Sequence, residues 1–270
     1  MQSLISIFSY PFIQRALIVG ILISLCAALL GVILVLKRYS LIGHGLGDVG
    51  FASTSLAVAL GLPILAVSIP VVIIAACLIM FYSQKTKSGG DVTIGIVATG
   101  ALSFCVIITA LSGGFNVDVS DYMFGSILAM SDTDVVMSLI LSAIIIIMYV
   151  LFYNRLFLVT CDETFAKTSG INVSFYQFVI ALLTALTVVL GMRMMGSLLI
   201  SSLIIFPAVT AKKLVKSFKS VVLLSVMFSI ICYILGIIAS FILNLPTGAS
   251  IVGVNIIVLC IVTLIAKVKR

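Results

Sequence analysis

The sequence predicts an all-α, polytopic membrane protein with eight or nine transmembrane helices. The chain has 270 residues, of which 63% are hydrophobic and only 9% are charged, and its mean hydropathy is +1.43. So few charged side chains cannot cover the surface of a water-soluble protein of this size. Long uncharged runs, each near the roughly 20 residues that cross a bilayer as a helix, recur along the chain. A soluble enzyme is therefore excluded.

These runs give nine candidate spans within one transmembrane domain, residues 1–270, although the second and seventh runs are short. No internal repeat or low-complexity tract divides the chain. The spans are 12–36, 46–62, 64–82, 92–112, 135–153, 174–191, 195–211, 220–243 and 249–266. A further apolar stretch, 122–130, is too short to span and is expected to form a re-entrant or interfacial helix.

The basic residues favour one orientation, with the N-terminus outside and the C-terminus in the cytoplasm. In that orientation, all of the 15 Lys and Arg residues except Arg15 and Arg193 lie on the inner side. Positive residues near span ends are retained in the cytoplasm, so we expect a multi-pass protein of the cytoplasmic membrane. The net charge of +7 is then explained by topology and by contact with anionic membrane lipid, and no nucleic-acid partner is expected.

The six cysteines carry no pattern that predicts a disulfide framework or a thiolate metal site. No CxxC pair occurs, and five of the six lie inside apolar runs. We expect them to be small buried hydrophobic side chains, and Cys161 to be a free thiol on the cytoplasmic side.

The segment 40–50 holds the only histidine of the chain and the only acid within a predicted span. His44 and Asp48 are four residues apart, so on a helix they share one face. An imidazole and a carboxylate on one face can together bind a zinc, manganese or iron ion. Four glycines in the same segment would let another helix or an ion approach the backbone closely. The alternative is that the two side chains only hydrogen-bond each other and lock helix packing.

A second segment, Asp162 to Gly170, is expected to form a short amphipathic helix in the cytoplasm. Asp162 at its start, Lys167 later and Gly170 as C-cap match the charge and capping preferences of helices. Such a helix outside the bilayer is a plausible contact for a cytoplasmic partner. The alternative is a connector held at the lipid headgroups.

A third segment, 196–213, contains Pro207 near the inner end of a predicted span. Proline removes a helix hydrogen bond, so we expect a break or kink there, beside the transport pathway. The hydroxyls of Ser201, Ser202 and Thr210 could bond the backbone carbonyls that are freed. The chain has no G-x-x-x-x-G-K-[ST] motif and cannot itself bind a nucleotide in a P-loop.

Together, in their order and spacing, these segments resemble the membrane permease subunit of ABC importers for manganese, zinc and iron. The likeness covers nearly the whole chain, although the family usually has the acid first and the histidine four residues later, whereas here His44 precedes Asp48. It rests on Leu36 to Gly43, Phe124 to Leu128, Asp162 to Gly170 with Ala166, and Gly196 to Leu199 followed by Pro207, Ala208 and Ala211.

The resemblance implies a permease subunit that moves divalent metal ions as substrate across the cytoplasmic membrane and is driven by a separate ATPase subunit. It implies a permease homodimer, cytoplasmic subunits that bind the ATP, and an extracellular metal-binding protein, with no cofactor and no catalytic residue in this chain. Its coupling segment would be Asp162, Glu163, Ala166 and Gly170, and its metal ligands His44 and Asp48. One alternative is a proton-coupled secondary metal transporter with His44 as the titrating group. A membrane metalloenzyme would need more ligands and a general base.

Overall fold

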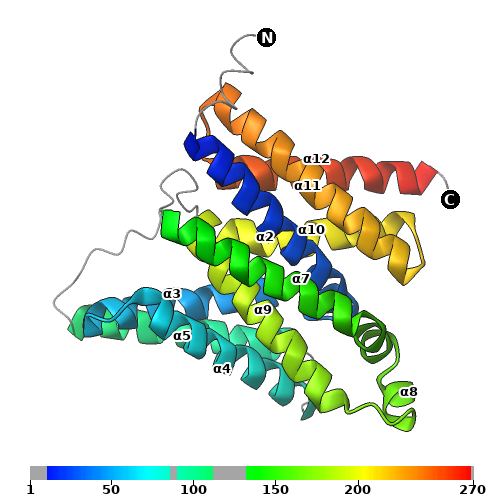
Figure 1. The fold of residues 1–270 in the computed structure, drawn as a ribbon, viewed down its shortest axis with the longest axis horizontal. Helices are drawn as coiled ribbons and strands as arrows, with labels where there is room; N and C mark the ends of the chain where they lie inside the picture. Colours follow the sequence, from blue (N-terminus) through cyan, green and yellow to red (C-terminus); the bar gives the residue numbers. More distant parts are fainter. Residues whose placement is uncertain (1–10, 86–89, 112–131, 269–270) are drawn as a thin grey trace.

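The computed structural model describes residues 11–85, 90–111 and 132–268, and every regular element within them is a helix. Figure 1 shows the long helices gathered into one bundle, with the short helix α8 at one end. The elements are α2 (Pro11–Leu36), α3 (Ile42–Leu60), α4 (Ile64–Lys85), α5 (Gly90–Leu111), α7 (Asp132–Cys161), α8 (Glu163–Thr168), α9 (Val173–Met195), α10 (Ser197–Leu214), α11 (Phe218–Leu243) and α12 (Thr247–Val268). The all-α prediction is confirmed.

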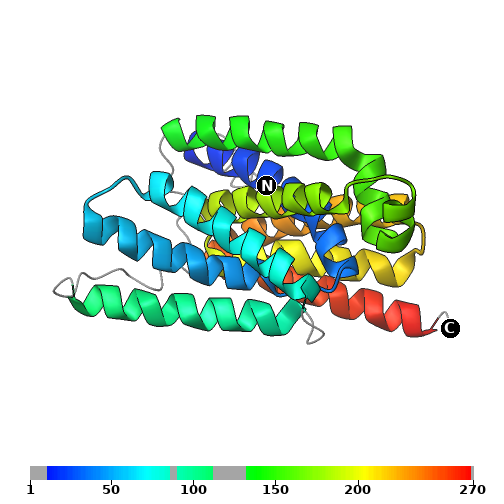
Figure 2. The ribbon, with the colours of Figure 1, turned by 90° about the horizontal axis from the view of Figure 1, so that it is seen from below.

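Eight of the helices in the described ranges are long and apolar enough to cross a membrane, and α3 is the long helix outside this set. Its sequence is rich in glycine and in serine and threonine, and it carries both His44 and Asp48. α3 nevertheless packs against α4, α5 and α10, and Figure 2 shows it running alongside α4 and α5. The more apolar neighbours therefore hold this polar helix within the bundle, which agrees with the prediction of eight or nine spans.

Several predicted boundaries are wrong, because helices continue past the polar residues that end an apolar run. α3 begins at Ile42 instead of 46, and α7 continues to Cys161 instead of ending at 153. Within the extension of α7, the Arg155 guanidinium donates to the Tyr176 hydroxyl at 2.6 Å. α7 can thus continue past this basic residue, because the long side chain reaches a polar partner. The re-entrant helix expected at 122–130 lies outside the described residues.

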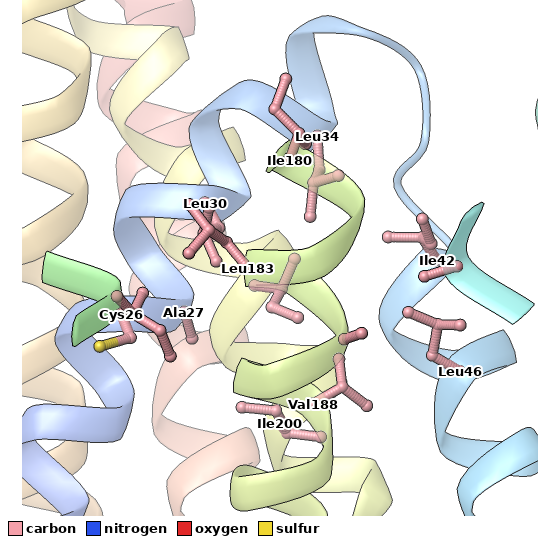
Figure 3. Packing of buried hydrophobic residues seen from close by; sticks show 14 of the residues in the cluster. Cys26, Ala27, Leu30, Leu34, Ile42, Leu46, Ile180, Leu183, Val188 and Ile200 are labelled. Carbon is pink, nitrogen blue, oxygen red and sulfur yellow. The ribbon is translucent and has the colours of Figure 1, made fainter. Parts of the chain in front are cut away.

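The core lies where α2, α9, α10 and α3 meet. Figure 3 shows Leu30 and Leu34 of α2 beside Leu183 and Ile180 of α9, all of them buried. α5, α7 and α12 instead expose most of their apolar side chains. Such an arrangement suits a bundle in which the peripheral helices face lipid and the central ones face each other.

One end of the bundle carries α8 and the C-terminal ends of α10 and α12 (Figure 1). The sequence of this end is rich in lysine. We call it the cytoplasmic end, because the charge rule places lysine-rich ends there. The described lysines at this end include Lys37, Lys167, Lys212, Lys213, Lys216 and Lys267.

Candidate metal site

A tight turn between α2 and α3 fixes where the metal-site helix begins. Arg38 adopts a left-handed conformation with φ 62°, and the Tyr39 amide donates to the Leu34 carbonyl at 2.9 Å. The buried Tyr39 ring lies against Gly90, where a β-carbon would come within 2.6 Å of it. α3 begins at Ile42, three residues after Tyr39, and so includes His44 in its first turn.

His44 and Asp48 lie on one open face of α3. Their Nε2 and Oδ2 atoms are 3.9 Å apart, which is too long for a hydrogen bond between them. The side chain of His44 is 64% exposed and that of Asp48 is 16% exposed. A tetrahedral zinc ion holds two ligand atoms about 3.4 Å apart, so a closure of about half an ångström would let both side chains bind one ion. At this separation the two groups are within ion-pair range but not hydrogen-bond range, and metal binding by the pair stays a prediction.

The glycines of α3 bring other helices against two of its remaining sides. A β-carbon on Gly43 or Gly47 would lie 3.0 or 3.1 Å from side-chain atoms of α10, and one on Gly45 would lie 2.5 Å from an α5 side chain. Small residues at helix contacts permit such close approach. The predicted close packing is confirmed, and it leaves the face with His44 and Asp48 between the α10 and α5 contacts.

In the part of the chain that the structure describes, His44 and Asp48 are not joined by a third strong ligand. Within the described residues, no group of three or more His, Cys, Asp or Glu side chains is placed to hold a metal ion. A structural zinc site uses four ligands, so two per chain make a weak site. A weak site suits an ion that passes through, since tight binding would slow its release.

The predicted cytoplasmic helix is present as α8, with the expected N-cap. The Asp162 side chain accepts from the Phe165 amide at 2.9 Å. Ser169, not Gly170, occupies the C-cap position, and Gly170 follows it at φ 76°, where its amide donates to the Lys167 carbonyl at 3.1 Å. Glycine adopts this left-handed conformation without the strain that a side chain adds.

α8 is fastened to the bundle by polar and apolar contacts. Ala166 is completely buried, and the Glu163 carboxylate accepts a hydrogen bond from the Gln177 amide of α9. Burial lowers the pKa of Lys37, at the end of α2, while the nearby Glu163 carboxylate opposes that shift. The opposite side of α8 exposes Phe165, so α8 joins two transmembrane helices on one side and is open on the other.

α10 runs without interruption through Pro207, which excludes a break, while a kink beside the transport pathway stays a prediction. The carbonyl that loses its bond is that of Leu203, four residues earlier. Serine and threonine in a helix bond carbonyls three or four residues before themselves, and these offsets miss Leu203. Ser201 donates to Ser197, Ser202 to Leu199 and Thr210 to Phe206.

Sequence reasoning missed Lys37 and Gln177 as neighbours of α8. Each lies far from Glu163 along the chain, and no local spacing rule connects residues on separate helices. Gln177 does offer one signal, because it is a polar side chain in a largely apolar span, and buried polar groups require partners.

With this geometry established, comparison with known proteins decides the family. The family model described as the ABC 3 transport family matches residues 9–266. The chain belongs to the ABC 3 transport family. Members of this family are transport permeases, so the ABC 3 match supports a transport role for this membrane chain.

Individual relatives of this ABC 3 chain match over nearly their full lengths. The high-affinity zinc uptake system membrane protein ZnuB of Haemophilus influenzae is 33% identical, covering 90% of this chain and 93% of the relative. The manganese transport system membrane protein MntC of Listeria monocytogenes is 28% identical, covering 96% and 92%. The structure of PsaBC from Streptococcus pneumoniae in complex with Fab matches with a TM-score of 0.84 and 28% identity, covering 97% of this chain and 94% of that one. The predicted family, fold and location in the cell membrane are confirmed.

Proposed function

We propose that this ABC 3 chain is the permease subunit of an ATP-driven importer for divalent transition metal ions such as zinc or manganese. The observation that carries the proposal is the pair His44 and Asp48 on an open face of a helix within the membrane bundle. Two relatives bear names of zinc and manganese transport systems, which agrees with this ligand chemistry.

Because His44 is exposed, we infer that a second copy of the chain packs over the face of α3 that carries His44 and Asp48. His44 lies in the first turn of α3, next to the cytoplasmic end, where an exposed ionisable side chain faces water or a partner that supplies polar groups. A homodimer that brought two such faces together would supply two imidazoles and two carboxylates. That set equals the four ligands that zinc takes, while remaining divided between two chains that can move apart.

The energy would come from a cytoplasmic ATPase subunit that contacts α8, and the metal from an extracellular binding protein. The contact would use Asp162, Glu163, Ala166 and Gly170, which shape α8 and its two ends. Glu163 bonds α9 and lies near Lys37, which directly precedes the turn into α3. A push on α8 would thus reach the helix that carries the metal pair, as rigid-body switching requires. This chain would hold no cofactor, and it would carry out no catalysis.

The proposal is tested by measuring whether metal uptake depends on ATP or on a proton gradient. The intact complex is reconstituted in liposomes with its binding protein, and uptake of radioactive zinc and manganese is measured with and without ATP. We expect uptake to require ATP and to continue when an ionophore collapses the proton gradient. Uptake that needs no ATP and stops with the gradient would instead support the proton-coupled alternative.

Changes in α8 should separate ATP hydrolysis from transport. Glu163→Ala removes the hydrogen bond to Gln177, and Gly170→Val strains a residue at φ 76°. We expect each to lower the metal transported per ATP by about tenfold, in Glu163→Ala because a charged hydrogen bond is lost and in Gly170→Val because the end of α8 is strained. A normal ratio in both variants would show that α8 is only a connector.

A further inference from the structure

A basic groove lies between the cytoplasmic ends of α10 and α12, apart from the metal pair and from α8. Its volume is about 780 Å³, and it is lined by four lysines, Lys212, Lys213, Lys216 and Lys267. The rest of the lining is mostly apolar and includes Val209, and no acidic residue of the described chain lines it. The groove therefore offers positive charge above an apolar floor.

The groove carries more positive charge than the partial negative charges at its two helix ends can balance. Lys212, Lys213 and Lys267 lie in the last turns of α10 and α12, where the helix dipoles favour cations. Each helix end carries only about half a negative charge, so two ends offset about one of the four lysines. An excess of about three positive charges remains for an external anion.

One lysine is already held in place. The Lys213 ammonium donates to the Thr263 hydroxyl at 2.8 Å, and that hydroxyl donates to the Leu259 carbonyl at 2.6 Å. This bond joins the two walls of the groove. The ammonium groups of Lys212, Lys216 and Lys267 belong to exposed residues and can turn towards an anion.

An apolar stripe on α12 leads away from the groove. Ile257, Ile261 and Leu264 are 59%, 50% and 65% exposed, and their spacing places them along one side of the helix. In a membrane this stripe faces hydrocarbon chains. A ligand that fits both parts must carry an anionic phosphate and long apolar chains, which is the chemistry of a phospholipid.

We propose that this groove binds the headgroup of an anionic phospholipid of the cytoplasmic leaflet. Its phosphate would contact the lysines, and its acyl chains would follow the stripe on α12. Basic pockets between transmembrane helices at the cytoplasmic surface bind acidic lipid headgroups in this way. The bound lipid would join α10 to α12 and add to the bond between Lys213 and Thr263.

Lipid binding to the purified complex of this chain with its ATPase tests the proposal. Native mass spectrometry is used to titrate dioleoyl phosphatidylglycerol against dioleoyl phosphatidylcholine. We expect clear preference for phosphatidylglycerol, and a loss of affinity of about fivefold for each lysine changed to glutamine at positions 212, 216 and 267. The control Lys219→Gln removes a charge near the start of α11, outside the groove lining, and should leave binding unchanged.

Two further variants test the groove without relying on the loss of three charges at once. Thr263→Val keeps every charge but releases Lys213, and it should weaken binding by a few fold while the unfolding temperature confirms an intact fold. If a variant with all three lysines changed to glutamine fails to fold, Lys216→Gln alone provides the test, because Lys216 lies beyond the end of α10.

Three results would overturn the proposal. One is equal binding of phosphatidylglycerol to the parent and the lysine variants. Another is displacement of the lipid by inorganic phosphate at equal concentration, which would indicate a free-anion site. The third is binding that appears only after the ATPase is removed, which would assign the lysines to the ATPase contact.

Discussion

Changing both His44 and Asp48 to alanine is expected to reduce metal uptake by at least about a hundredfold, with the complex still assembled. The two side chains are the ionisable donors that this chain places on the open face of α3. Their removal should cost little stability, because His44 is mostly exposed and neither side chain belongs to the hydrophobic core. Uptake of radioactive zinc and manganese is measured in cells, and the amount of complex in the membrane is measured in parallel.

The matched control exchanges the two residues. His44→Asp combined with Asp48→His keeps both donors on the same face and restores the order usual in the family. We expect this variant to keep much of the uptake and to change the ratio of zinc to manganese carried, because ligand geometry tunes metal preference. Undiminished uptake in the double alanine variant would remove both residues from the metal route.

Gly31→Ala is expected to destabilise the bundle by at least about 3 kcal/mol, beyond the usual cost of a surface change. A β-carbon at Gly31 would lie 2.1 Å from the backbone oxygen of Ile204. A side chain can turn away from such a clash, but this oxygen belongs to the backbone of α10. α2 and α10 would therefore have to separate. Thermal unfolding of the detergent-purified chain and its abundance in membranes measure the effect.

Gly253→Ala, on α12, is the control for that change. Nothing lies within 4 Å of the added β-carbon there, and alanine favours a helix more than glycine does. We expect unfolding temperatures equal to or slightly above that of the parent. If Gly31→Ala unfolded at the same temperature as Gly253→Ala, the contact between α2 and α10 would be looser than the structure indicates.

The features that sequence reasoning predicted well are those set by local spacing. Bilayer thickness fixes the length of an apolar run, and a separation of four residues places His44 and Asp48 on one face. The start of α3 could not be found in this way, because the turn before it, with Arg38 at φ 62° and Tyr39 against Gly90 about fifty residues later, follows no helical spacing. The exposure of His44 likewise depends on which sides of α3 are covered by α10 and α5.

The continuity of α10 at Pro207 and the neighbours of α8 were both beyond the reach of local sequence rules. Pro207 sits in a helix that is continuous and packs on α2, α11 and α12, contacts between helices that a local proline rule does not consider. The hydrogen bond between Glu163 and Gln177 joins α8 to α9, and the periodicity of the sequence does not indicate that these two side chains meet. Tertiary packing thus decided the features that local rules left open or predicted wrongly.

The glycine contact between α3 and α10 also bears on how α3 can move. Interlocked side chains must change rotamers before one helix can shear along another, but Gly43 and Gly47 present no protruding groups to α10. On the other side, Gly45 receives the Ile94 side chain and keeps α3 in register with α5. Sliding of α3 along α10 would therefore displace few side chains of α3 at this contact, while α4 and α5, which also pack on α3, would have to move with it or repack.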